Sequence, residues 1–288
     1  MIRTKGQKVF SAVNGLLMLL VAAVALFPFL HEVSKSISDE AAVMAGDVGL
    51  IPIGFNLRTY RVVLGTYDFW RSLAVSAVIT VAGTVLQIVV LSLAAYPLSR
   101  RVFPGKRIFL FLFVFTMLFN GGLIPTYLVV KSLGLLDKLW ALILPGLVNV
   151  FNLILLRNYF LTVPDSLEDS ARIDGCSNLT VFARIVFPLS LPAVATIAVY
   201  CAVSYWNGYF GALIYISSKT LQPLSIYLRT MVIEADSQLV NLNPELANLN
   251  PESLRSATVV AATLPILLVY PFLQRYFVKG ALVGAVKE

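Results

Sequence analysis

Long apolar stretches alternate with shorter polar segments along the whole chain. The apolar stretches cover residues 9–30, 72–98, 108–130, 139–157, 189–216 and 256–275. Apart from an arginine at the last position of two of them, they contain no Asp, Glu, Lys or Arg. About 20 helical residues cross a hydrocarbon core of ~30 Å, and only helices or closed barrels satisfy the backbone there. Because the alternation of barrel strands is absent, the pattern predicts an all-α membrane protein with six transmembrane helices.

Composition and charge add a direction to this topology. Hydrophobic residues make up 58% and charged residues 13%, with a mean hydropathy of +0.84, against roughly 45–50% and 25% in soluble domains. The N-terminus, the loops 100–107 and 157–184 and the tail from Arg275 hold 13 Lys/Arg and 5 acids, whereas the other three loops hold 9 and 10. Basic loops stay cytoplasmic, so we expect one membrane domain, residues 1–288, with both termini in the cytoplasm. Anionic lipid then balances the net charge of +7, and no nucleic-acid partner is needed.

The chain lacks the motifs of several enzyme classes. It has no G-x-x-x-x-G-K-[ST] loop for ATP phosphates, no G-x-S-x-G elbow, and a single histidine, His31, which excludes a His-based zinc site. Cys176 and Cys201 fall in a loop and in a span and are not expected to pair. The spans also lack the charged residues that ion coupling uses. Energy for uphill transport would come from another subunit; an ion-coupled secondary transporter or a membrane-embedded scaffold without nucleotide dependence is the alternative.

Residues 164–188 predict a helix–glycine–helix hairpin on the cytoplasmic side. Asp165 or Ser166 can cap a first helix, and Glu168 in its first turn suits the helix dipole. Gly175 suits a left-handed stop. A second helix then presents Phe182 and Ile185 on an apolar face. On these grounds alone, an ordinary amphipathic connector explains the segment as well as a docking element does.

Nine positions in and after this loop follow a fixed spacing. They are Glu168, Ala171, Asp174, Gly175, Phe182, Ile185, Pro188, Leu189 and Pro192. Together they resemble the EAA loop of ABC-importer permeases, and Asp169 and Ser170 depart from that pattern. Residues 120–127 (NGGLIPTY) and the stretch from Gln274 to Lys287 are similar to the maltose-type second permease family, in a subgroup that takes up oligosaccharides. That subgroup includes the second permease of the alginate importer and LplC/YtcP-type permeases.

The resemblance implies an ABC type I importer permease in the bacterial cytoplasmic (inner) membrane. Its partners would be a second homologous permease subunit, two ATPase subunits that bind ATP-Mg, and a periplasmic or extracellular solute-binding protein that delivers an oligosaccharide. This chain would bind no cofactor or metal and would have no catalytic residue. The implied ATPase-coupling residues are Glu168, Ala171, Asp174 and Gly175, with Phe182 and Ile185 holding the loop against the membrane half. The charge of Glu168 is expected on the docking surface.

A pathway for sugars needs amides and aromatic rings rather than charges, because sugars present hydroxyls and apolar ring faces. Asn149 and Asn152 lie three residues apart and are predicted to share one face of the fourth span. The other candidates are Asn120, Tyr205, Trp206 and Asn207. Hydrogen bonds between helices explain any one of these residues equally well. The acid-rich outer loop 219–255 is expected to reach the binding protein.

Overall fold

The computed structural model describes residues 5–100, 102–233 and 250–285, and every regular element in these ranges is helical. The chain forms two compact units. Of the described residues, those within 1–70 and 227–265 form the first unit, and those within 71–226 and 266–288 form the second. Helices α4 (Tyr67–Ser99), α14 (Leu224–Ile233) and α17 (Pro251–Ala285) contribute to both units.

The first unit is organised around the end of α1 (Lys5–Ser36), which contains the first predicted span. Apolar side chains along most of α1 are exposed, as expected for a helix that faces lipid. Its last turns are tied down by polar contacts. The hydroxyls of Ser36 and Tyr60, on α3 (Arg58–Gly65), are 2.8 Å apart, and Ser256 on α17 donates to the Glu32 carboxylate at 2.6 Å. The short α2 (Glu40–Ala45) follows α1.

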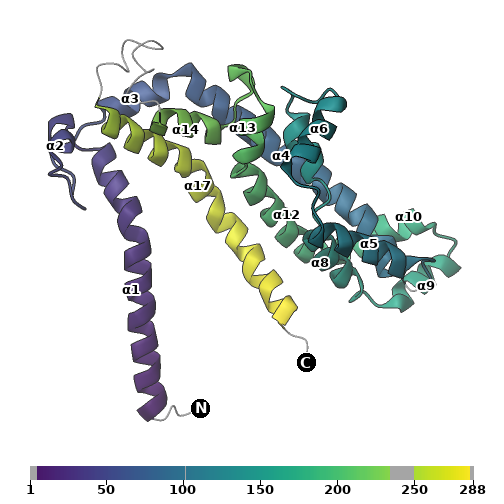
Figure 1. Ribbon diagram of the computed structural model, residues 1–288. Coiled ribbons are helices and arrows are strands. Elements are labelled where there is room, and N and C mark those ends of the chain that lie inside the picture. Colours follow the sequence, from purple (N-terminus) through teal and green to yellow (C-terminus); the bar gives the residue numbers. More distant parts are fainter. Residues whose placement is uncertain (1–4, 101, 234–249, 286–288) are drawn as a thin grey trace. The chain divides into compact units, whose positions relative to one another are not determined.

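The second unit contains most of the helices. Besides α4 they are α5 (Lys106–Leu118), α6 (Leu123–Ser132), α7 (Trp140–Ile143), η1 (Leu144–Gly146), α8 (Val150–Phe160), α9 (Asp165–Ile173), α10 (Asn178–Val181), η2 (Phe182–Val186), α11 (Phe187–Leu189), α12 (Leu191–Trp206), α13 (Phe210–Tyr215) and η3 (Lys219–Leu221). One buried cluster joins the end of α4 to α8, α12 and the segment after α9; Leu91, Leu156, Phe160, Val181 and Ile197 are among its members. Helices α9 and α10 lie at one end of this unit, beside α5 and α8 (Figure 1).

Three of the six predicted spans are continuous helices, namely α1, α4 and the part of α17 up to Val269. The other three predicted spans are bent pairs of helices: Pro188 and Pro192 indicate the break before α12, whereas the sequence analysis did not predict the breaks in the third and fourth spans. The axis bends by 112° between α5 and α6, by 54° between α7–η1 and α8, and by 80° between Asn178–Leu189 and α12. Glycine and proline mark the breaks: Gly122 has φ of 89°, which side-chain-bearing residues rarely adopt, and Pro145 lies in η1. The described part of the chain reaches six spans if each bent pair counts as one.

The outer loop predicted over residues 219–255 is partly helical. It contains η3, α14 and the start of α17. Residues 234–249, its acid-rich centre, lie outside the described ranges.

We predict that Gly83 on α4 is required for close packing against α12. A Cβ added at Gly83 would lie 2.8 Å from the ring of Tyr205, and overpacking of this kind costs about 1–3 kcal/mol. Gly83→Ala should therefore lower the melting temperature of the detergent-purified protein, measured by differential scanning fluorimetry. Gly15→Ala is the control, because no atom lies within 4 Å of a Cβ there. Equal melting temperatures for the two variants would contradict this packing.

Candidate functional site

The hairpin formed by residues 165–189 begins with α9 and turns at a left-handed glycine. Gly175 has φ of 78°, and the next amide, of Cys176, donates to Ala171 O at 2.9 Å. The left-handed stop predicted at Gly175 is confirmed. The second helix, α10, begins at Asn178 and is capped by Ser177, whose hydroxyl accepts from the amide of Thr180 at 3.2 Å. The predicted cap of the first helix is wrong: Pro164 precedes α9, with no side-chain cap.

Apolar side chains hold the hairpin against the ends of the spans. Ala171 and Phe182 are buried within the cluster that contains Phe160, and Ile185 is half-buried at its edge. The ring of Phe182 lies 5.1 Å from that of Tyr96 on α4, centroid to centroid. Three of the predicted coupling residues therefore face the membrane half rather than the surface.

Glu168 is the most buried charged residue of the hairpin, with 4% of its surface exposed. Its carboxylate forms an ion pair with Arg100, at the end of α4, with Nη1 and Oε1 2.7 Å apart. The expectation that this charge lies on an exposed docking surface was therefore wrong. Arg100 also donates to Phe160 O at 3.2 Å, and its guanidinium lies 5.0 Å from the centroid of the Tyr96 ring.

Burial raises the pKa of the Glu168 carboxyl above its ordinary value, while the nearby guanidiniums of Arg100 and Arg172 act in the opposite direction. Desolvation is thus the larger effect on this carboxylate. A buried ion pair of this kind adds little net stability compared with apolar residues, yet loss of one partner is costly. The pair therefore acts chiefly to fix where the hairpin sits.

The exposed part of the hairpin is its turn, residues 173–175. Ile173 is 87% exposed, and Asp174 and Gly175 beside it are also exposed. An isoleucine this exposed is unusual in a charged segment, and Ile173 was not among the predicted coupling residues. Its position directly before an Asp-Gly turn is the signal that could have found it, because the residue before such a stop projects from the end of the helix.

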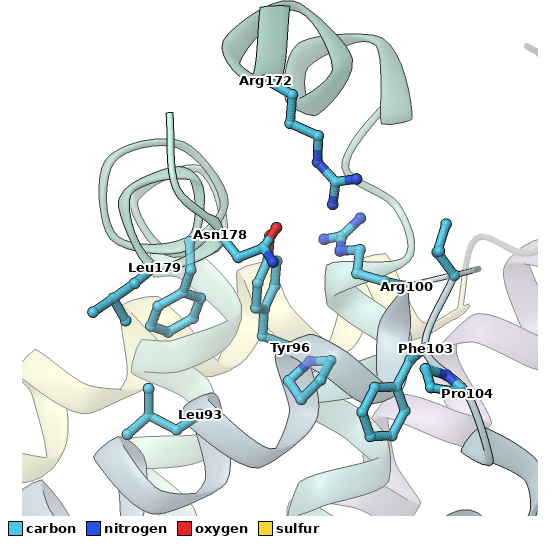
Figure 2. Close-up of a pocket in the computed structure, with 11 residues that line it drawn as sticks. Leu93, Tyr96, Arg100, Phe103, Pro104, Arg172, Asn178 and Leu179 are labelled. Carbon is cyan, nitrogen blue, oxygen red and sulfur yellow. The ribbon is translucent and has the colours of Figure 1, made fainter. Parts of the chain in front are cut away.

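A basic pocket lies between the hairpin and the end of α4, with a volume of about 450 Å³. Figure 2 shows the guanidiniums of Arg100 and Arg172 facing each other, with the Asn178 amide and the Tyr96 ring beside them. Leu93 and Phe103 line its apolar part. The hairpin thus leaves an amphipathic space where it meets α4.

A separate polar cavity of about 260 Å³ lies among the broken spans. Its lining residues are Gln87, Gly146, Asn149, Phe151, Asn152, Tyr200, Cys201, Ser204 and Tyr205. Two side chains satisfy carbonyls at the break before α8: Gln87 donates to Gly146 O at 2.9 Å, and the Tyr205 hydroxyl donates to Ile143 O at 3.3 Å. An unwound span whose carbonyls meet side chains at a cavity is a common arrangement in transporters.

The structure brings together only part of the predicted pathway set. Asn149, Asn152 and Tyr205 line the polar cavity. Asn149 caps α8 by accepting from the amide of Asn152 at 3.0 Å, so the two do not simply share a helix face as predicted. Asn120 lies in the break between α5 and α6, where its side chain accepts from Gly122 N. Trp206 and Asn207, at the end of α12, are not among the lining residues.

Comparison with known families gives the chain its class. Residues 9–283 match the family model described as "Binding-protein-dependent transport system inner membrane component". The chain belongs to this family.

Two relatives and one solved structure extend over nearly the whole chain. The "Polygalacturonan/rhamnogalacturonan transport system permease protein YtcP" of Bacillus subtilis (strain 168) is 46% identical over 272 residues, which are 94% of this chain and 95% of that protein. Protein LplC of the same strain is 46% identical over 285 residues, 99% and 97% of the two chains. A crystal structure of a bacterial ABC transporter involved in the import of the acidic polysaccharide alginate contains a chain with 36% identity and a TM-score of 0.90, covering 96% of this chain and 99% of that one.

We predict that the Arg100–Glu168 pair is strongly coupled in a double-mutant cycle. Glu168→Leu or Arg100→Met alone leaves one buried charge without its partner, which costs about 3–5 kcal/mol. The double variant should recover much of that loss, because neither charge remains. Thermal unfolding and the rate of proteolysis within residues 165–189 would measure the effect. Additive losses in the double variant would show that the two side chains do not act as a pair.

Proposed function

We propose that this protein is the permease subunit of an ATP-driven, binding-protein-dependent importer of oligosaccharides. The relatives named for polygalacturonan/rhamnogalacturonan and alginate import support the oligosaccharide class. The observation that carries the proposal is the exposed turn at Ile173 on a hairpin whose opposite face is buried against the spans.

The proposed assembly pairs this chain with a second homologous permease, two ATPase subunits and a solute-binding protein outside the membrane. Both termini and the hairpin face the cytoplasm of a bacterial cell in this arrangement, as the distribution of Lys and Arg favours. ATP-Mg is bound and hydrolysed on the ATPase subunits. This chain itself supplies half of the pathway and no cofactor site.

Coupling follows from the way that the hairpin is held. The turn at residues 173–175 enters a partner surface, and the buried face carries the resulting displacement into α4, α8 and α12. The Arg100–Glu168 ion pair and the contact between Phe182 and Tyr96 make the hairpin and the end of α4 move together. Gln87 lies on α4 13 residues before Arg100, which directly follows the last residue of that helix; this separation corresponds to about 20 Å along a helix axis. Movement of the hairpin thus reaches the polar cavity.

The coupling role predicts a specific loss of function. Ile173→Ser removes the exposed apolar contact, and Gly175→Val costs about 1–2 kcal/mol at a left-handed position. In liposomes that contain the whole importer, both variants should insert normally, yet transport per ATP hydrolysed should fall severalfold. Met44→Ser, at an equally exposed apolar residue on α2, is the control. Normal coupling in Ile173→Ser and Gly175→Val would remove the main support for this role.

The polar cavity is proposed as part of the sugar pathway. Gln87→Leu removes an amide from it, and a lost hydrogen bond of about 0.5–1.5 kcal/mol corresponds to a roughly two- to tenfold weaker interaction. We expect the KM for oligosaccharide uptake to rise or the maximal rate to fall by that factor, while ATPase stimulation by loaded binding protein persists. Trp206→Phe, outside the cavity, should leave uptake unchanged. If Gln87→Leu lowers only the melting temperature, the amide acts in packing alone.

A further inference from the structure

The basic pocket between α4 and the hairpin has the two parts of an amphipathic ligand site. At one wall lie the guanidiniums of Arg100 and Arg172, with the Asn178 amide beside them (Figure 2). Leu93, Pro97, Phe103, Pro104 and Leu179 line its apolar part. Its volume of about 450 Å³ is within the range typical of small-molecule sites.

The charged wall presents two guanidiniums, and the neighbouring carboxylates form ion pairs with only one of them. Arg100 is already paired with Glu168, and its other acidic neighbour, Asp165, is half-exposed at 3.8 Å. Within the described ranges, no Asp or Glu lies within ion-pair distance of Arg172. The Nε of Arg100 is buried and has no hydrogen-bond acceptor in the part of the chain that the structure describes. Both carboxylates of this wall, those of Glu168 and Asp165, approach Arg100. The Arg172 guanidinium and the Nε of Arg100 are therefore the donors that a further anion would meet.

The apolar wall extends toward the hydrocarbon region. Leu93 lies inside the continuous apolar helix α4, six residues before its end at Ser99, and is half-exposed. Six residues correspond to about 9 Å along a helix. A soluble anion or a side chain of a soluble partner would use only the basic wall, whereas a lipid would use both walls. Basic pockets between spans on the cytoplasmic side suit anionic lipid headgroups.

We propose that this pocket binds an anionic phospholipid of the cytoplasmic leaflet. The phosphodiester lies between Arg100 and Arg172 and accepts from the Asn178 amide, and the first part of one acyl chain lies along Leu93 and Phe103. The assignment of this pocket to the cytoplasmic leaflet rests on the proposed function. A bound lipid would join the hairpin to α4 through a second contact beside the Glu168 ion pair, so coupling would depend on the composition of the membrane.

Two measurements on the complete importer test this site. The first is retention of phospholipid after detergent purification, determined by native mass spectrometry. We expect the wild type to keep anionic lipid and Arg172→Gln to keep severalfold less. Arg184→Gln is the matched control, because Arg184 is an exposed arginine of the same hairpin that does not line the pocket. Equal retention in the wild type and Arg172→Gln would overturn the proposal.

The second measurement is transport in vesicles of phosphatidylcholine, alone or with about one third phosphatidylglycerol. The wild type and Arg184→Gln should be stimulated severalfold by the anionic lipid, and Arg172→Gln should not. Stimulation by inorganic phosphate in phosphatidylcholine vesicles would assign the site to a free anion instead, and cross-linking of Arg172→Cys to an ATPase subunit in place of lipid would assign it to that subunit. Either result contradicts the proposal. Failure of transport in both vesicles with lipid retention intact would contradict the proposed function and leave this site supported.

Discussion

The ion pair between Arg100 and Glu168 determines where the hairpin can lie. Glu168 is almost completely buried, and this burial raises the pKa of its carboxyl. Such a carboxylate is tolerated only where a guanidinium meets it, and Arg100 meets it in one arrangement, over the ring of Tyr96 and against Phe160 O. Apolar contacts such as those of Phe182 give most of the attraction but permit sliding. The ion pair therefore fixes the position of the hairpin, and the aromatic contacts contribute most of the attraction that holds it there.

The hairpin and the polar cavity share their supporting helices. α4 carries Gln87 and ends directly before Arg100, while α12 follows the hairpin directly and carries Tyr205. Packed interiors transmit displacement because they have few voids. The cavity, in contrast, lies where helices are interrupted and side chains replace backbone partners. The proposed coupling path thus leads from a tightly packed cluster to a region of interrupted helices.

Composition was sufficient to predict an all-helical membrane protein, and the Asp-Gly pair was sufficient to predict the turn at Gly175. The breaks in the third and fourth spans were not predicted, because the length of an apolar stretch shows that a segment is surrounded by lipid or protein but does not show whether its helix is continuous. Gly121-Gly122 and Pro145-Gly146 carried that information locally. The partner of Glu168 lies 68 residues earlier in the chain, and no local pattern indicates such a pairing. The chemistry of Trp206 suits a sugar pathway, but this residue at the end of α12 does not line the cavity.

The π-helical turn η2, Phe182–Val186, makes the chain sensitive to insertions and deletions at this point. Between Phe182 and Val186 the helix contains an extra residue per turn, and the amide of Phe187 donates to Phe182 O, five residues back. Each residue of an ordinary helix advances the side-chain direction by about 100°. Removal of one residue here would restore an ordinary turn and would rotate everything upstream against everything downstream by about that angle. The wide turn therefore sets the rotation of the residues before it relative to those after it. With this rotation Phe182 packs in the apolar contacts of the hairpin and Tyr205 on α12 lines the cavity. An insertion within these five residues would misalign the two sites without removing a residue from either.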